Sequence, residues 1–551
     1  MWLLFILVIA ASGLTLTMHT TSSFIDLHSG SDVRGVVGET SPLSFTAAFY
    51  IGRAFAARAC SSTSTSTSTS TSTIVIGYDP RSHSSSLSEH FALGARFQGA
   101  QVTSTKLSTT PAQCYFARSS LYAFSVMVTA SHLPRDKNGF KFFVRDDSSG
   151  QNSARGLTSS EIVALLLHAD KMREEDGATE QSQSQSQSPS FAPPKFTPPI
   201  TDLIPSYLKY LTQSFPLLAA DNSNIKQLKV VVNSGSGSGF ILADLLTSLG
   251  AQTFKMHCTP DPNFPPRGDP PNPECELMTA DTRLRCQEVA ADVGILFDTD
   301  ADRVGFLLPN KHDGSYEVVN KNRLIALLAA LLPSSSSNNN EKHVIVTDST
   351  TSEGLTKFLE QHNCVHTRHL KGYNNVIGKG KVLNAAIAIE TSGHCAMRSN
   401  DYSDDGMFTA MFILNELVQH PKTNPLEQLI NLEECEFETE IRFDVLSGLL
   451  SDLPILFDKF IEVVASMAPG LGEIDKENIE PGIRVRFTNE LTGGFFMLRK
   501  SVHDPVLSLM VDCVTKEQAV TRVLKPLLDN LQSVEGFAET VDLGNLKKAS
   551  L

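Results

Sequence analysis

The chain has 551 residues, which at roughly 150 residues per domain predicts three to four domains, and its 41% hydrophobic content excludes global disorder. Its 46 Lys and Arg against 60 Asp and Glu give a net charge of −14, so we expect no nucleic-acid partner and no membrane-surface binding. The nine cysteines are scattered without a CxxC pair, which argues against a disulfide scaffold or a zinc module.

The N-terminus carries the longest uninterrupted apolar run, residues 2–11, followed by small residues. The run is shorter than the roughly 20 residues of a membrane helix but typical of a signal-peptide core. We therefore predict that residues 1–20 are a targeting segment and that the mature form has no membrane anchor. The Lys or Arg that usually precedes the apolar core of a signal peptide is missing here. A buried first strand would have a similar sequence and is the alternative. Nine cysteines without a recognisable pairing pattern fit secretion poorly. We favour delivery to a plastid through the secretory route, with a cytoplasmic location as the alternative.

Low-complexity polar tracts interrupt the chain at residues 61–73, 181–190 and 334–340, where we expect loops because polar repeats cannot bury a core. Between them, apolar strand-like runs alternate with helical patterns, which predicts α/β domains with mostly parallel sheets. The predicted strands are residues 74–76, 124–128, 228–232, 293–297, 343–346 and 385–389, and the predicted helices are residues 161–171, 239–249, 321–332, 354–361 and 407–419. After Glu434, strands at 435–443, 482–488 and 495–498 and helices at 457–467 and 515–531 indicate an α+β domain.

The strongest site signal directly follows the predicted strand at residues 293–297. Asp298, Asp300 and Asp302 occupy alternate positions before Arg303, and a curling loop can bring three such carboxylates onto one hard cation. Without a metal they would repel one another. An EF-hand is excluded because its sixth position would be Arg303 instead of Gly. A phosphatase of the haloacid-dehalogenase type, with Asp298 as nucleophile, and a solvated acidic turn remain alternatives.

Other polar loops also follow predicted strands, at the sheet edge where ligands bind in α/β domains. Ser131 is a candidate nucleophile, but no G-x-S-x-G elbow surrounds it. Glu390 and Ser392 offer an acceptor and a donor suited to the vicinal hydroxyls of a sugar. The basic loop that begins at Arg499 suits a dianion. Taken singly, each loop could equally be an ordinary capped or solvated turn.

In order and combination these loops closely resemble those of the α-D-phosphohexomutase superfamily, the phosphoglucomutases and phosphomannomutases. Further matches are the segments 29–35, 77–81, 110–111 and 272–274, and the resemblance covers roughly residues 25 to 545. It implies a four-domain, heart-shaped architecture of three α/β domains with mixed sheets plus a C-terminal α+β domain. The implied domains are 25–199 with a phosphoserine loop, 200–320 with a metal loop, 321–434 with a sugar loop and 435–551 with a phosphate loop.

The resemblance implies an isomerase that interconverts the 1-phosphate and 6-phosphate of glucose or mannose. Phosphoserine would carry the phosphoryl group, with a hexose 1,6-bisphosphate as intermediate and activator. The implied catalytic residues are Ser131, His132, Lys141, Arg303, His394 and Arg34, with Lys141 and His394 preferred as the acid/base pair. The implied Mg²⁺ ligands are Ser131, Asp298, Asp300 and Asp302. The implied sugar-binding residues are Glu390, Ser392 and Lys371, and the phosphate-binding residues are Arg499, Ser501 and His503.

The phosphate loop departs from the family pattern. Lys500 replaces Pro, while Val502 and His503 replace Gly or Asn and Thr, so a hydroxyl and a flexible backbone are lost. A catalytically impaired, sugar-phosphate-binding descendant therefore stays open as an alternative, as does a phosphoglucosamine mutase. The phosphatase alternative lacks the Thr expected after its Asp-x-Asp. We expect small-molecule sugar phosphates as partners and a monomer or dimer.

Overall fold

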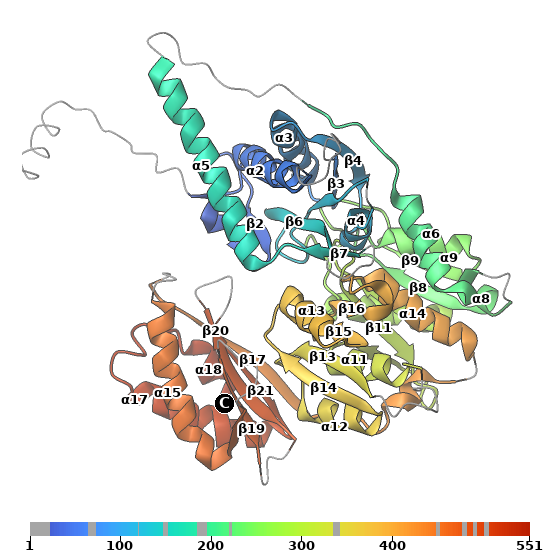
Figure 1. Ribbon diagram of the computed structural model, residues 1–551. Helices are drawn as coiled ribbons and strands as arrows, with labels where there is room; N and C mark the ends of the chain where they lie inside the picture. The colour runs from blue at the N-terminus through green and yellow to red at the C-terminus, as the bar shows by residue number, and fades with distance from the viewer. Residues whose placement is uncertain are drawn as a thin grey trace, which may run out of the picture.

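The computed structural model describes residues 23–63, 73–119, 121–146, 153–183, 196–219, 223–333, 342–421, 423–447, 452–475, 482–488, 493–500 and 506–551 (Figure 1). The predicted targeting segment, residues 1–20, lies outside these ranges, as do Ser501 and His503. The described residues form four sheets, and we call the parts of the chain that carry them domains I to IV in chain order. Within these ranges no helix is both long and apolar enough to cross a bilayer.

Domain I is a mixed sheet with helices on both faces. Its strands, in spatial order, are β1 (His28–Ser29), β2 (Asp32–Val36), β6 (Lys137–Asp146), β5 (Phe124–Val128), β3 (Thr73–Tyr78) and β4 (Gln101–Leu107), and β7 (Ser153–Gly156) pairs with β6. Its helices are η1 (Phe24–Leu27), α2 (Phe45–Thr63), α3 (Ser84–Phe97), α4 (Thr110–Ala117) and α5 (Ser159–Gln183). Alternation along β3 explains the layers: Ile74 and Ile76 pack with α2 and α3, while Val75 packs with α4.

Domains II and III share one continuous apolar core. Domain II has the strand order β12 (Tyr316–Val319), β11 (Val304–Pro309), β10 (Val293–Phe297), β8 (Lys229–Asn233), β9 (Gln252–Met256), with helices α6 (Ile204–Ser214), α7 (Pro216–Ala219), α8 (Ser223–Gln227), α9 (Phe240–Ser248) and α10 (Glu276–Val289). Domain III has the order β14 (Cys364–His369), β13 (His343–Asp348), β15 (Ile387–Ile389), β16 (Cys395–Met397), with α11 (Lys321–Ala330), α12 (Glu353–Gln361), α13 (Tyr373–Val382), η3 (Arg398–Asn400), α14 (Gly406–Gln419) and η4 (Pro425–Leu429).

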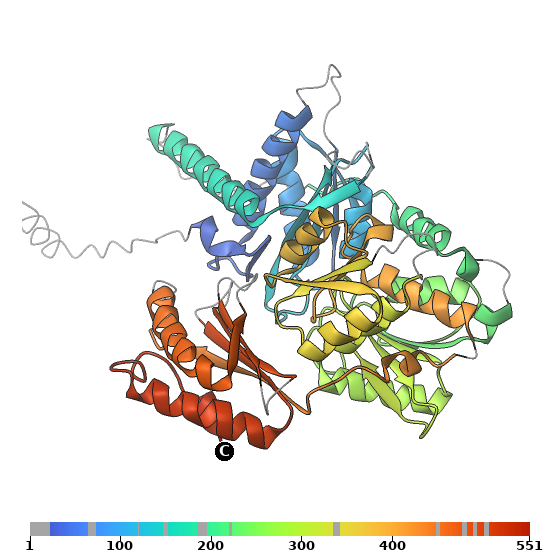
Figure 2. The same cartoon turned by 60° about the horizontal axis from the view of Figure 1, so that its bottom comes forward.

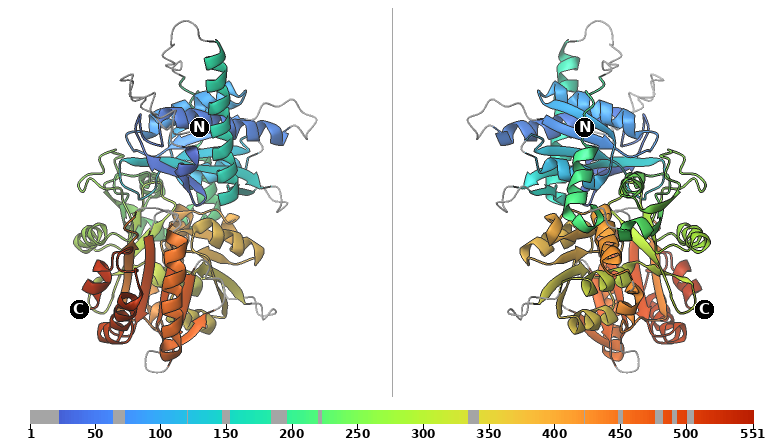
Figure 3. Two further views of the ribbon diagram at one scale, coloured as in Figure 1. Left: turned by 90° about the vertical axis from the view of Figure 1, so that its left-hand side faces the viewer. Right: turned by 90° about the vertical axis from the view of Figure 1, so that its right-hand side faces the viewer.

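Domain IV has a core of its own and an antiparallel sheet. The strand order is β17 (Phe437–Asp444), β21 (Val506–Cys513), β20 (Phe495–Lys500), β19 (Gly482–Phe487), β18 (Gly472–Asp475), and the helices are α15 (Leu453–Leu471), α16 (Lys516–Gln518), the π-helical η6 (Ala519–Leu524), α17 (Lys525–Ser533) and α18 (Gly544–Ala549). In Figure 2 the orange and red domain IV stands beside domain III, and in Figure 3 it lies at the opposite end of the molecule from the blue domain I.

The predicted architecture is confirmed, with two corrections. The sheets of domains I to III are mixed, as the family resemblance implies, and not mostly parallel, as the alternation of strands and helices alone predicts. The reason is that β6, β11 and β16 return antiparallel beside β5, β10 and β15. The loops between these partners are too short for the crossover helix that a parallel return requires. In addition, α2 and α5 continue to Thr63 and Gln183, into tracts predicted as loops. The short loops that connect these antiparallel strands matter for function, because candidate site residues lie in them.

Candidate active site

The loop after β5 holds Ser131 in a fixed and strained position. Ser131 is a non-glycine residue with φ of 52°, in the left-handed region, and its N–H donates to Thr129 Oγ1 at 2.9 Å. The buried Arg81 pairs with Asp79 at 3.2 Å and clamps the loop. Its guanidinium donates to the carbonyl oxygens of Ser131, Leu133, Pro134 and Lys137 at 2.5 to 3.0 Å. The clamp explains how an unfavourable backbone conformation persists at Ser131.

The acidic loop after β10 meets Ser131 across the boundary between domains I and II. Ser131 Oγ donates to Asp298 Oδ2 at 2.7 Å and accepts from Arg303 Nη2 at 3.1 Å. Asp298, Asp300 and Asp302 are fully buried and each can place one oxygen within 4.8 Å of the others. Burial and the charge of Asp302 raise the pKa of Asp298 to about 7, although Arg303 opposes this. The predicted metal residues therefore come together.

The residues present fit a divalent cation. Among the described residues, Asp300 Oδ1 and Asp302 Oδ1 are buried oxygens without a hydrogen-bond partner. Buried carboxylate oxygens are costly without a partner, and oxygen ligands are those that Mg²⁺ prefers. The Ser131 hydroxyl stands beside them and would complete the set through its oxygen or a phosphoryl group on it.

Lys141 and Arg34 border the same centre. Lys141, on β6, contacts Asp302 directly and Asp300 at 3.6 Å, and it lies over the ring of Tyr373 at 5.0 Å. Arg34, on β2, donates to the backbone oxygen of Thr129 in the serine loop. Both predicted residues are thus placed against the serine and acidic loops.

His394 and His132 both interact electrostatically with Arg303, but their pKa values shift in opposite directions. His394 Nδ1 is 2.7 Å from Asp404 Oδ2. Although burial disfavours its charged form, the carboxylates of Asp404 and Asp302 raise the pKa of His394 to about 9. The positive charge of Arg303 and burial lower the pKa of His132 to about 2. At neutral pH His394 can donate a proton and His132 is neutral.

Sequence reasoning gave no role to Asp404 or Tyr373. Asp404 also accepts from the Cys395 N–H at 3.0 Å, so two bonds fix it beneath His394. Tyr373 stacks on His394 with ring centroids 5.0 Å apart, and its hydroxyl donates to Asp32 at 2.9 Å. An Asp ten residues after a His matches no known sequence spacing. The pairing of His394 with Asp404 therefore becomes visible only in the folded structure, where β16 returns beside β15.

The predicted sugar-binding residues Lys371 and Ser392 lie close to the third, Glu390, whose carboxylate is buried. Glu390 Oε1 accepts from the Gly372 N–H at 2.6 Å, directly after Lys371, and Ser392 Oγ donates to Glu390 Oε2 at 3.4 Å. Gly372 has φ of 117°, which only glycine adopts readily. Asp348 accepts from both the N–H and the hydroxyl of Thr391, at 2.6 and 2.9 Å. The Thr391 hydroxyl is therefore hydrogen-bonded to Asp348, the same carboxylate that holds the backbone of this loop.

Of the predicted phosphate residues, only Arg499 lies within the described ranges. It stands near the end of β20, with Nη2 3.0 Å from Glu440 Oε1. Sequence reasoning did not foresee this carboxylate partner, because Glu440 lies on β17, far away in the chain.

Comparison with known proteins agrees with this geometry. The chain matches three family models, described as phosphoglucomutase/phosphomannomutase, alpha/beta/alpha domains I, II and III, over residues 27–159, 205–311 and 320–434. A phosphomannomutase/phosphoglucomutase of Pseudomonas putida is 29% identical over 483 residues, 87% of this chain and 89% of that protein. A phosphoglucomutase of Neisseria gonorrhoeae is 26% identical over 501 residues, 90% of this chain and 95% of that protein.

The fold is also that of a solved relative. The crystal structure of a phosphoglucomutase/phosphomannomutase family protein from Burkholderia thailandensis superimposes with a TM-score of 0.70 at 22% identity, covering 93% of this chain and 98% of that one. That match extends beyond the three family domains into the C-terminal part. Because the family domains follow one another in order around the loops just described, the chain belongs to the phosphoglucomutase/phosphomannomutase family of α-D-phosphohexomutases.

Proposed function

We propose that the protein interconverts hexose 1-phosphate and hexose 6-phosphate, with glucose or mannose as the sugar, through phosphoserine at Ser131 and a hexose 1,6-bisphosphate intermediate. The observation that carries the proposal is the buried Ser131 hydroxyl, 2.7 Å from Asp298 and 3.1 Å from the Arg303 guanidinium. A nucleophilic oxygen between a carboxylate cluster and a fixed cation suits phosphoryl transfer. Membership of this family rules out the haloacid-dehalogenase alternative.

In the proposed reaction, the bond between phosphorus and Ser131 Oγ breaks as a bond to a free sugar hydroxyl forms. The hydroxyl proton passes to the neutral form of an adjacent base, and Ser131 Oγ leaves with the electron pair of the broken bond. When the second phosphate moves back to Ser131, the same group returns the proton to the sugar oxygen that is released. His394, held by Asp404 at 2.7 Å, carries a proton at neutral pH and is suited to the proton-donating half of this role, and Lys141 contacts the same Tyr373 ring.

Asp298, Asp300 and Asp302 would hold Mg²⁺. When bound, this ion supplies positive charge that neutralises the phosphoryl oxygens. Arg303 adds a fixed cation on the same side, since its Nε donates to Asp298 at 3.0 Å. Chelation of divalent ions should therefore abolish turnover, and added Mg²⁺ should restore it.

The bisphosphate must turn round between the two transfers, so one set of residues has to bind the sugar in both orientations. Glu390 and Ser392 offer an acceptor and a donor for the sugar hydroxyls, beside Lys371. Arg499 would hold the phosphate that does not react, with Ser501 and His503 completing that site.

A coupled assay tests the proposal on the purified chain with Mg²⁺ and a trace of glucose 1,6-bisphosphate. Glucose 1-phosphate, mannose 1-phosphate and glucosamine 1-phosphate are offered separately. We expect turnover with glucose or mannose phosphate that Ser131→Ala abolishes, and a phosphopeptide at Ser131 by mass spectrometry. Ser88→Ala removes another buried hydroxyl of domain I, 2% exposed, and should retain activity. Turnover of glucosamine phosphate alone would name a phosphoglucosamine mutase, and none at all would favour a binding descendant.

We also propose that residues 1–20 direct the protein to a plastid. The support is the apolar run at residues 2–11, together with nine scattered cysteines that include no CxxC pair. An import assay with isolated plastids and microsomes tests this, and an uncleaved cytosolic product would contradict it.

A further inference from the structure

Arg499 has a carboxylate from its own chain as its partner. Glu440 Oε1 lies 3.0 Å from Arg499 Nη2 and accepts from Ser508 Oγ at 2.5 Å, while Arg442 Nε lies 3.9 Å away. These residues come from adjacent strands, since β21 pairs with both β17 and β20 and sets Ser508 opposite Arg442 on one side and Arg499 on the other. The sheet therefore builds a small site of two cations, one hydroxyl and one anion.

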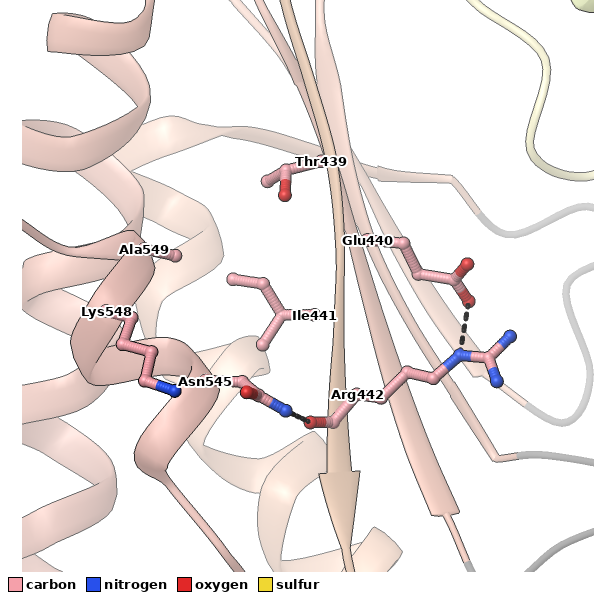
Figure 4. A pocket seen from close by; sticks show the side chains of 7 residues that line it. All are labelled: Thr439, Glu440, Ile441, Arg442, Asn545, Lys548 and Ala549. Atoms are coloured by element: carbon pink, nitrogen blue, oxygen red, sulfur yellow. Dashed lines mark hydrogen bonds and ion pairs between the residues drawn. The ribbon is translucent and has the colours of Figure 1, made fainter. Parts of the chain in front are cut away.

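Glu440 projects from the open face of β17. Figure 4 shows Glu440 and Arg442 on one side of the strand, while Thr439 and Ile441 point to the other side, toward α18 with Lys548. Neighbouring side chains along a strand alternate between faces, so the amines of α18 cannot reach the Glu440 carboxylate. The side chain of Glu440 is 39% exposed and that of Arg499 is 20% exposed, so both are accessible to a ligand.

The Glu440 carboxylate is held in its charged form. Burial opposes the charge, but the hydrogen bond from Ser508 and the positive charge of Arg499 lower its pKa below the ordinary value. The positive charge of Lys371, in the sugar segment of domain III, contributes to the same shift. At neutral pH an anion therefore stands in the place where Arg499 would meet a phosphate.

We propose that Glu440 is a specificity-determining residue of the phosphate subsite, an internal anion that a sugar phosphate must displace from Arg499 and that weakens the binding of dianions. The inference rests on the proposed function, because it takes Arg499 as a phosphate ligand. A phosphate bound to Arg499 lies within several ångströms of Glu440, where like charges in a half-exposed site repel appreciably. Such repulsion would also keep a bisphosphate loosely enough bound to turn round.

The test compares the full chain with Glu440→Gln, which keeps the shape and the acceptor oxygen for Ser508 and removes only the charge. Inorganic phosphate is titrated by calorimetry, and KM and kcat are measured with hexose 1-phosphate. We expect the Kd for phosphate and the KM to fall about fivefold to tenfold, with less change at high salt, while kcat does not rise. Glu473→Gln is the matched control, because Glu473 lies on β18 at the far edge of the same sheet, paired with Arg486 at 2.8 Å.

Arg499→Ala separates the possible results. The proposal predicts that this change weakens phosphate binding and removes most of the gain from Glu440→Gln in the double variant. An unchanged or higher Kd in Glu440→Gln, an equal gain in Glu473→Gln, or a gain that persists without Arg499 would overturn it. If the wild-type chain turns over no hexose phosphate while Glu440→Gln still tightens phosphate binding through Arg499, the role of Glu440 stands and the mutase assignment fails.

Discussion

Replacing Arg81 by Lys should separate the positioning of Ser131 from the binding of the sugar. Arg81 is 3% exposed and donates to carbonyl oxygens along the serine loop as well as pairing with Asp79. A lysine ammonium keeps the charge but has three donors on one nitrogen, so it cannot span the same carbonyls. Losing two bonds from a charged donor, at about 1.5 kcal/mol each, should lower the free energy of unfolding by about 3 kcal/mol.

The loss should appear in catalysis as well, because the left-handed conformation of Ser131 depends on this clamp. We expect kcat to fall about tenfold with little change in KM, since a misplaced nucleophile weakens the transition state and not the sugar site. Urea unfolding and steady-state kinetics measure the two effects. Arg285→Lys is the control, on the exposed face of α10 with Glu288 at 2.9 Å, and should lie within about 0.5 kcal/mol of wild type. If Arg81→Lys were as stable and as active as this control, the clamp argument would be wrong.

Three further substitutions test other parts of the site. Asp404→Asn removes the carboxylate 2.7 Å from His394 and should lower kcat about a hundredfold at unchanged KM, which initial rates at saturating substrate measure. Thr391→Val keeps the shape but deletes a hydroxyl that donates at 2.9 Å to the carboxylate beneath the sugar loop, so KM should rise about threefold, whereas Thr391→Ser should restore it. Glu353→Gln weakens the pair with the fully buried Arg484 at 2.7 Å, and chemical denaturation should show a loss of about 1 to 3 kcal/mol.

Sequence patterns located the site because its loops are short and follow buried strands. Ser131, Asp298 and Glu390 each stand within a few residues of an apolar run that forms β5, β10 or β15. In α/β sheets the carboxyl ends of strands meet at one edge, so local patterns were sufficient to collect these residues. The direction of the returning strands was not predictable from the same runs, because it depends on loop length and on partners elsewhere in the chain.

The residues of the site that the sequence did not predict are those that contact segments far apart in the chain. Glu440 reaches Arg499 across the β17–β21–β20 sheet, and Tyr373 joins Asp32 of domain I to His394. None of these pairings leaves a periodic or spaced signal, since each is set by strand order or by packing between domains. A single sequence therefore predicted several residues that the fold brings together at the candidate site, but not the groups that hydrogen-bond to them or stack on them.

Domain IV shows why such contacts matter for function. Its core is separate from the core shared by domains II and III. Charged pairs of described residues link it to domain III, among them Arg484 with Glu353 at 2.7 Å and Lys321 with Glu438 at 2.7 Å. Polar interfaces between domains permit relative motion more readily than apolar ones. Arg499, the proposed phosphate ligand, is carried by this separately cored domain, while Ser131 belongs to domain I. A phosphate on Arg499 and a sugar beside Lys371 would thus add an ionic bridge across the same boundary, so substrate binding and the docking of domain IV should stabilise each other.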